Sequence, residues 1–183
     1  MATHKIIISG FGGQGVMLMG TMLAYAGVME EKEVTWLPSY GPEMRGGTAN
    51  CSVIISDRPI SAPTITKATC VAAMNTPSLI KFEGLVTKGG MLFVNSSLID
   101  HEITRDDIDR FEIPANDLAK SLQNERTANM IMLGAIVLKT GVVKMETIIK
   151  VTRKIFSGSK KNLLLINLTA LEVGQKEVQK TIV

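Results

Sequence analysis

The chain has 183 residues, a formal net charge of +3, and 45% hydrophobic and 20% charged residues. This composition is typical of a folded protein of one domain with a hydrophobic core of its own, and it argues against a disordered chain. The charge is too small to imply a nucleic-acid-binding face, and aromatic residues, at 4%, are too few to stack against the bases of a single strand.

The cysteines and the N-terminal segment bear on cofactors and compartment. Cys51 and Cys70 do not form a CxxC pair, so the four ligands of an iron–sulfur cluster are not available. Cys51 lies in an alternating apolar run and is interpreted as a small core residue. Residues 1–5 contain no apolar signal region, and the longest apolar runs are too short to span a bilayer. We therefore expect a cytoplasmic protein.

Strands and helices are expected to alternate along the chain. Residues 5–9 form a β-branched run typical of a buried parallel strand, and residues 14–29 follow with helical spacing. Further strands are expected at 34–37, 48–56, 69–74, 91–94 and 111–113, and further helices from about 77 and over 114–122, 128–139, 145–156 and 162–178. The pattern predicts an open, mostly parallel, Rossmann-like α/β sheet with flanking helices and a helical C-terminal part, in a single domain over residues 1–183.

Several residues mark where these elements end. Pro38 is expected to end the second strand, residues 88–90 (Lys-Gly-Gly) to form a turn, Asn75 to cap the helix near residue 77, and Gly141 to end the helix at 128–139. That helix is nearly all apolar and should be buried on most sides. Ala170 and Gly174, four residues apart, form a small face that another backbone could approach.

A glycine turn follows the first strand. Residues 10–15 (GFGGQG) satisfy G-x-G-x-x-G immediately before a helix. Glycine permits positive φ and close approach of a phosphate, and the free amides at the helix start attract an anion, to which Gln14 can add its side-chain amide. The alternative is a tight turn that binds nothing. A nicotinamide site would also need an acid after the second strand, which instead ends in Leu37-Pro38-Ser39.

A second loop, residues 38–47 (PSYGPEMRGG), should emerge at the carboxyl end of the sheet beside the glycine turn. Arg45 could pair with a phosphate or with a partner's carboxylate, and Gly46 and Gly47 let a ligand or another subunit come close. Tyr40 supplies a flat apolar body with a polar tip. For this loop alone, a surface loop with a solvated arginine is an equally good interpretation.

Together the two loops carry a resemblance. GFGGQG followed at this spacing by PSYGPEMRGGTANCSV resembles the gamma subunit of 2-oxoacid:ferredoxin oxidoreductases. Asn129-Met130 with residues 133–135 resembles that family's buried helix, and Asn167, Ala170 and Gly174 resemble its last helix, so the similarity covers nearly the whole chain. The SYGPEMRGG form is more similar to the 2-oxoglutarate and branched-chain types than to the pyruvate type. The beta subunit of indolepyruvate oxidoreductase is a related alternative.

The resemblance implies a role inside a larger complex. Such complexes decarboxylate a 2-oxoacid, transfer the acyl group to coenzyme A and pass two electrons to ferredoxin. It implies that thiamine diphosphate, magnesium and iron–sulfur clusters are held by the partner alpha and beta subunits, with delta where present. This agrees with the missing cluster cysteines and with the absence of a GDG…N thiamine motif. Neither His4 nor His101 lies in a catalytic constellation, so no catalytic residue and no metal ligand are expected here.

Site residues are carried over from the family by matching positions. The glycine turn would face a pyrophosphate or the active-site edge, and the second loop would line the approach of coenzyme A. The competing functions are an independent NAD- or FAD-dependent enzyme and a scaffold whose glycine turn only packs a helix onto the sheet. The expected cofactor-binding residues are Gly10, Gly12, Gly13, Gln14, Gly15, Tyr40, Arg45, Gly46 and Gly47.

Overall fold

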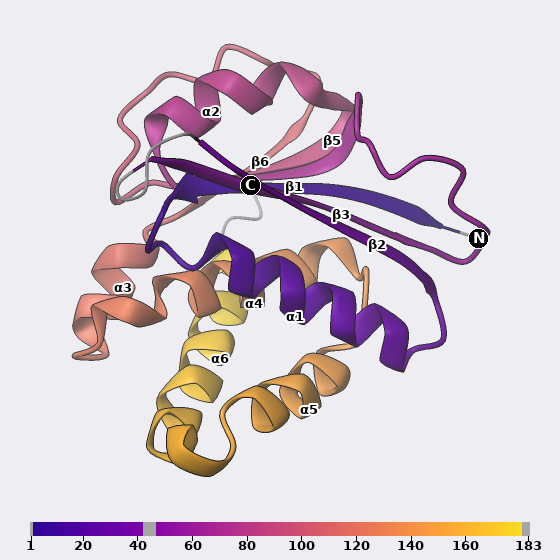
Figure 1. Cartoon of the computed structure of the whole chain (residues 1–183). Helices are drawn as coiled ribbons and strands as arrows, with labels where there is room; N and C mark the ends of the chain where they lie inside the picture. The colour runs from indigo at the N-terminus through magenta and orange to yellow at the C-terminus, as the bar shows by residue number, and fades with distance from the viewer. Residues whose placement is uncertain (1, 42–46, 181–183) are drawn as a thin grey trace.

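A six-stranded sheet of order β2-β3-β1-β4-β5-β6 runs through the molecule (Figure 1). The computed structural model describes residues 2–41 and 47–180. Strands β1, β4, β5 and β6 are mutually parallel, and β3 runs antiparallel to both of its neighbours. The mostly parallel α/β sheet predicted from the sequence is therefore confirmed. The strands are β1 (Thr3–Phe11), β2 (Glu33–Tyr40), β3 (Thr48–Ser56), β4 (Ala68–Ala73), β5 (Val86–Asn95) and β6 (Asp109–Ile113).

Helices cover both faces of the sheet unequally (Figure 1). Ile6 and Ile8 of β1 pack into the core on the side of most helices, whereas Ile7 packs into a smaller core on the side of α2. Both faces of this strand are buried, which explains its continuous apolar run. One face carries α1 (Val16–Met29), α3 (Ala115–Ser121), α4 (Ala128–Thr140), α5 (Met145–Ile155) and α6 (Leu164–Lys180), and the other carries α2 (Thr76–Phe82).

The two helices α4 and α6 pack backbone to backbone. A Cβ added at Gly174 would run into the carbonyl oxygen of Ile131, and a Cβ added at Gly134 would run into that of Leu171. The small face predicted in the last helix is thus confirmed, and the backbone that approaches it belongs to α4. Gly141 ends α4 with a φ of 58°, as expected.

Two expected boundaries are wrong for identifiable reasons. Pro38 does not end β2 but lies inside it, opposite Cys51 of β3. Because β2 is an edge strand, the missing amide of proline is tolerated there. Residues 88–90 lie within β5 rather than in a turn, at a point where the register against β4 shifts between Ala68 and Cys70. Gly89 accommodates this irregularity with a φ of 70°.

After the neighbouring parallel strands β1 and β4, the chain continues into helices on opposite faces of the sheet. The chain leaves β1 into α1 on one face and leaves β4 into α2 on the other. Asn75 caps α2 as predicted, since its Oδ1 accepts a hydrogen bond from the amide of Ser78 at 2.9 Å. In open α/β sheets, ligands bind outside the carboxyl ends of the strands at such a switch point. The glycine turn lies there. In the described part of the chain, no helix is both long and apolar enough to cross a bilayer.

Candidate functional site

The glycine turn joins β1 to α1 and depends on its glycines in different ways. Gly13 and Gly15 have φ angles of 99° and 76°, which only glycine adopts readily. The expectation of positive φ is wrong for Gly10 and Gly12, because Gly10 is still part of β1 and neither has a φ in that range. Gly10 instead sits in a tight space, since a Cβ would lie 3.0 Å from Cβ of Met74 and 3.0 Å from Cγ1 of Val16, and would displace Oε1 of Gln14. At Gly12 a Cβ would meet, within residues 2–41 and 47–180, only the oxygen of Gly47, at 3.8 Å.

The second loop meets the glycine turn where it returns to the sheet. The amide of Gly12 donates a hydrogen bond to the carbonyl of Gly47 at 3.0 Å, so the two segments lie side by side as predicted. Tyr40, the last residue of β2, is 69% exposed. Two residues predicted to bind cofactor in this loop, Arg45 and Gly46, lie outside the described residues.

The start of α1 offers unpartnered amides. Gly15 precedes the helix without a side-chain cap, and the first turn contains no acidic residue. The amides of the first helical turn have no partner within their own helix and carry a partial positive charge. Gly13 contributes an open backbone, since no atom of the described residues lies within 4 Å of a Cβ added there. The turn can therefore accept an anion through its backbone.

The side chain of Gln14 holds the turn in shape. Its Oε1 accepts hydrogen bonds from the amide of Phe11 at 2.6 Å and from Nδ2 of Asn75 at 3.1 Å. Its Nε2 donates to the carbonyl of Met74 at 3.1 Å. Gln14 thus links the turn after β1 to the end of β4. This geometry engages the amide within the protein, while its predicted contact with a ligand stays a prediction.

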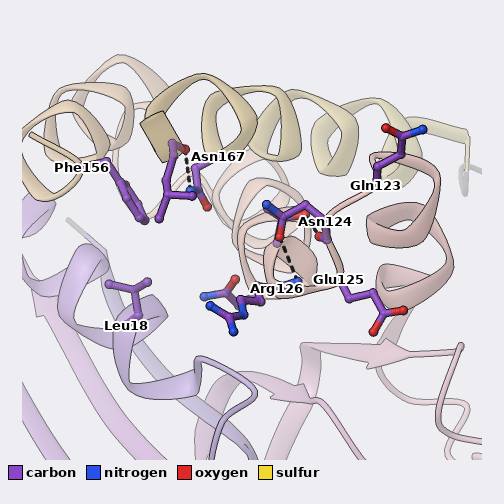
Figure 2. A pocket seen from close by; sticks show the side chains of 10 residues that line it. Leu18, Gln123, Asn124, Glu125, Arg126, Phe156 and Asn167 are labelled. Carbon is purple, nitrogen blue, oxygen red and sulfur yellow. Dashed lines mark hydrogen bonds between the residues drawn. The ribbon is translucent and has the colours of Figure 1, made fainter. Parts of the chain in front are cut away.

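A groove that sequence analysis did not single out flanks the turn on the helical side (Figure 2). It encloses about 640 Å³ and includes the 3-10 turn η2 (Glu125–Thr127), α1 and α6. A smaller hollow of about 240 Å³ adjoins it and reaches Gly13, and the two share Glu125, Arg126 and Asn129. We call the two together the Arg126 groove. Its larger hollow is lined by Leu18, Gln123, Asn124, Glu125, Arg126, Thr127, Asn129, Phe156, Leu163 and Asn167.

The sequence contained a signal for the turn that carries Arg126, though not for the groove around it. Asn124 precedes an almost wholly apolar helix, and it accepts a hydrogen bond from the amide of Arg126 through Oδ1 at 3.2 Å. Its carbonyl also accepts from the hydroxyl of Thr127 at 2.7 Å. Asn124 therefore orders the turn that carries Arg126 in front of α4. A lone arginine at the start of a buried helix is a candidate anion contact, because that helix places it at the carboxyl side of the sheet.

The thiols are chemically inert in this fold. Cys51 and Cys70 are both free and buried, as predicted for Cys51. Burial raises the pKa of the Cys51 thiol to about 12, against smaller opposing hydrogen bonds to Trp36 and Gly20. Burial raises the pKa of Cys70 as well. In residues 2–41 and 47–180, no three His, Cys, Asp or Glu side chains lie close enough together to hold a metal ion.

The comparisons with known proteins identify the family. The family model described as pyruvate ferredoxin/flavodoxin oxidoreductase matches residues 5–177. The chain belongs to this family. Within it, the chain falls among the gamma subunits of 2-oxoacid:ferredoxin oxidoreductases, which confirms the resemblance of its two loops.

Several relatives illustrate the match. The ketoisovalerate oxidoreductase subunit VorA of Methanothermobacter marburgensis is 36% identical over 180 residues, which are 97% of this chain and 37% of the relative. The chain thus spans only about 37% of the length of its ketoisovalerate relatives. The 2-oxoglutarate synthase subunit KorC of Methanocaldococcus jannaschii is 33% identical over 149 residues, 80% of each chain.

Solved structures agree in fold. The gamma subunit of a keto/oxoacid ferredoxin oxidoreductase from Geobacter sulfurreducens superposes with a TM-score of 0.86 at 29% identity over 98% of both chains. The 2-oxoglutarate:ferredoxin oxidoreductase of Magnetococcus marinus gives a TM-score of 0.90 at 21% identity, over 98% of this chain and 32% of that one. The same fold therefore occurs both as a chain of this length and as one part of a longer chain.

Proposed function

We propose that this chain is the gamma subunit of a thiamine diphosphate-dependent 2-oxoacid:ferredoxin oxidoreductase and contributes to its coenzyme A site and to subunit packing. The observation that carries the proposal is the hydrogen bond from Gly12 to Gly47, 3.0 Å long. In a chain of this family, it brings a backbone able to accept an anion next to Gly47, the last residue of the second loop. The reaction is oxidative decarboxylation of a 2-oxoacid to an acyl-CoA with reduction of ferredoxin.

The proposed substrate is 2-oxoglutarate or a branched-chain 2-oxoacid. The names of the relatives KorC and VorA, at 33% and 36% identity, support this choice. The Magnetococcus structure contains 2-oxoglutarate, coenzyme A and succinyl-CoA. We assign thiamine diphosphate, magnesium and the iron–sulfur clusters to the alpha and beta subunits, and to delta where it is present. We also propose that residues 1–183 form one domain and that the protein is cytoplasmic.

Within the site, the glycine turn is the proposed cradle for a pyrophosphate. Gly13 and Gly15 shape its backbone, and Gly12 leaves open space toward the second loop. Arg45 is proposed to pair with an anionic part of coenzyme A, with Gly46 and Gly47 lining its approach. Tyr40 stands exposed at the end of β2 and is available to the same ligand.

The test is reconstitution from separately purified chains. The complete complex should reduce ferredoxin when given a 2-oxoacid and coenzyme A, and the mixture without this chain should not. The isolated chain should show no such activity even with thiamine diphosphate added. Full activity of the partners without this chain, or turnover by this chain alone, would overturn the proposal.

A substitution at Gly12 tests the turn itself. Gly12→Val should leave the chain folded, since among the described residues a Cβ there meets only the oxygen of Gly47 at 3.8 Å. The branched side chain should nonetheless raise the apparent KM for coenzyme A by filling the approach of the ligand. Unchanged kinetics in an assembled complex would remove the case for this turn.

Titrating the isolated chain separates the remaining functions. Binding of NAD without coenzyme A would favour an independent dinucleotide enzyme, for which the end of β2 (Leu37 to Tyr40) offers no acid to hold a ribose. Binding of neither would favour a scaffold. A preference of the reconstituted complex for an aryl 2-oxoacid would favour the indolepyruvate alternative.

A further inference from the structure

We infer that the Arg126 groove binds a phosphorylated adenosine, with the phosphate at Arg126 and the base against the apolar wall formed by Leu18, Phe156 and Leu163. Arg126 and Glu125 are the two charged residues of its lining, and Arg126 is the single cation among them. The inference rests on the proposed function for the identity of the ligand, which is then the nucleotide end of coenzyme A.

The charge of Arg126 is available to a ligand. In the described part of the chain, no carboxylate lies within salt-bridge distance of its guanidinium. Figure 2 shows its side chain extending toward Leu18 of α1, whereas Glu125 extends in the opposite direction. Because its fork of N–H donors matches a phosphate group, an unpaired arginine in a groove favours that partner.

Two nearly buried asparagines point to the same conclusion. Asn129 is 5% exposed, and its Oδ1 accepts from the amide of Met130 at 2.9 Å. Among the described residues its Nδ2 has no acceptor, although it lies against Gly15 and lines both parts of the groove. This nitrogen is not among the fully buried side-chain atoms that lack a partner, so it is open to an acceptor from a water or a ligand in the groove. Asn129 therefore offers a donor beside the start of α1.

Asn167 supplies the complementary group on α6. It is 6% exposed and donates through Nδ2 to the carbonyl of Leu163 at 2.8 Å. In residues 2–41 and 47–180, its Oδ1 accepts no hydrogen bond, and Figure 2 places it beside Phe156. An amide oxygen next to an aromatic wall suits the amino edge of a purine. The groove thus presents donors at one end and an acceptor with apolar contacts at the other.

A larger hollow at the opposite end of α1 does not share these features. It encloses about 870 Å³ around residues 29–32 and α5. Two of its charged groups are already engaged: Glu30 accepts from the amide of Lys144 at 2.7 Å, and Lys32 donates to the carbonyl of Val142 at 2.7 Å. Its lysines share the hollow with three glutamates, and Met29 and Val143 are its large apolar residues, whereas the Arg126 groove combines an unpaired arginine with a wall of Leu18, Phe156 and Leu163.

The experiment uses calorimetric titration of the full chain with adenosine 3′,5′-bisphosphate, adenosine and inorganic phosphate. The bisphosphate should bind more tightly than adenosine or inorganic phosphate, and added salt should weaken its binding.

Arg126→Ala should weaken binding of the bisphosphate at least tenfold. Arg126→Lys should recover part of the loss, and Glu125→Gln should strengthen binding. Arg153→Ala, which removes an exposed arginine of α5 outside the groove, is the matched control and should change nothing. Equal affinity in Arg126→Ala and wild type would overturn the inference.

The reconstituted complex separates this inference from the proposed function. Arg126→Ala should raise the KM for coenzyme A with little change in kcat, since the nucleotide end is remote from the reacting thiol. If the complex makes acyl-CoA and this KM is unchanged, the inference fails and the proposed function stands. If it makes no acyl-CoA while the isolated chain binds the bisphosphate through Arg126, the proposed function fails and the groove remains a nucleotide site. Circular dichroism of each variant checks its folding.

Discussion

The side-chain oxygen of Gln14 accepts a hydrogen bond from Nδ2 of Asn75 at 3.1 Å, and so links the glycine turn to the residue that caps α2. The same side chain donates to the carbonyl of Met74 at 3.1 Å. Asn95 of β5 donates to that carbonyl at 3.3 Å. One amide therefore ties together the carboxyl ends of β1 and β4, where the chain diverges to the two faces of the sheet.

Replacing Gln14 by methionine should destabilise the protein by about 1–3 kcal/mol, because the partly buried donors and acceptors lose their partners. Urea unfolding followed by circular dichroism measures the change. Gln179→Met, at an exposed position of α6, is the matched control and should stay within about 0.5 kcal/mol of wild type. In the reconstituted complex, Gln14→Met should also raise the KM for coenzyme A. Wild-type stability in this variant would mean that the three hydrogen bonds contribute nothing net.

Gly174 is expected to be intolerant of any side chain. Gly174→Ala would drive a methyl group into the backbone of Ile131, so α4 and α6 would have to separate, at a cost of about 1–3 kcal/mol. Gly84→Ala is the control, because nothing lies within 4 Å of a Cβ at that position. Thermal or urea unfolding should show a loss for the first variant and no loss for the second. Equal stability of the two would contradict the close packing.

The sequence specified the elements better than their limits. The apolar runs of β1 and β3 and the cap at Asn75 were predictable, because local patterning and turn chemistry determine them. The end of β2 was not predictable from Pro38, since nothing in the sequence shows that β2 lies at an edge. The place of Gly89 was not predictable either, because a positive φ fits a turn and an irregular strand equally well.

At the candidate site too, local features were predictable from the sequence and long-range contacts were not. The glycine turn was predictable from spacing, whereas the engagement of Gln14 with Asn75 joins residues 61 positions apart and depends on the sheet order. Arg126 was missed because its neighbours in the groove come from α1, α6 and the segment between α5 and α6, which only the tertiary fold brings together. Patterns in one sequence do not report such contacts.

Neither thiol should react in the native protein. Because burial raises the pKa of Cys51 to about 12 and also raises that of Cys70, almost no thiolate exists at pH 8, and reagents cannot reach the sulfur. A colorimetric disulfide reagent should therefore titrate no thiol in buffer and both thiols in denaturant. Rapid reaction of either cysteine in the native state would show that its part of the core opens readily.

His4 should make stability depend on pH near neutrality. Burial lowers the pKa of this half-buried imidazole, the charge of Lys32 lowers it further, and Asp57 opposes both. As the pH falls, the unfolded chain therefore binds a proton at His4 before the folded protein does. The free energy of unfolding should fall as the pH drops from about 7.5 through the pKa of His4 in the unfolded chain, about 6.5, and on through its lower pKa in the folded protein. His4→Gln should flatten this slope, and His101→Gln, at an exposed position, should preserve it. Urea unfolding at half-unit steps between about pH 5.5 and 7.5, a window above the ordinary carboxylate range, measures both. A slope that survives in His4→Gln, or stability that rises on acidification, would show that His4 is not the group responsible.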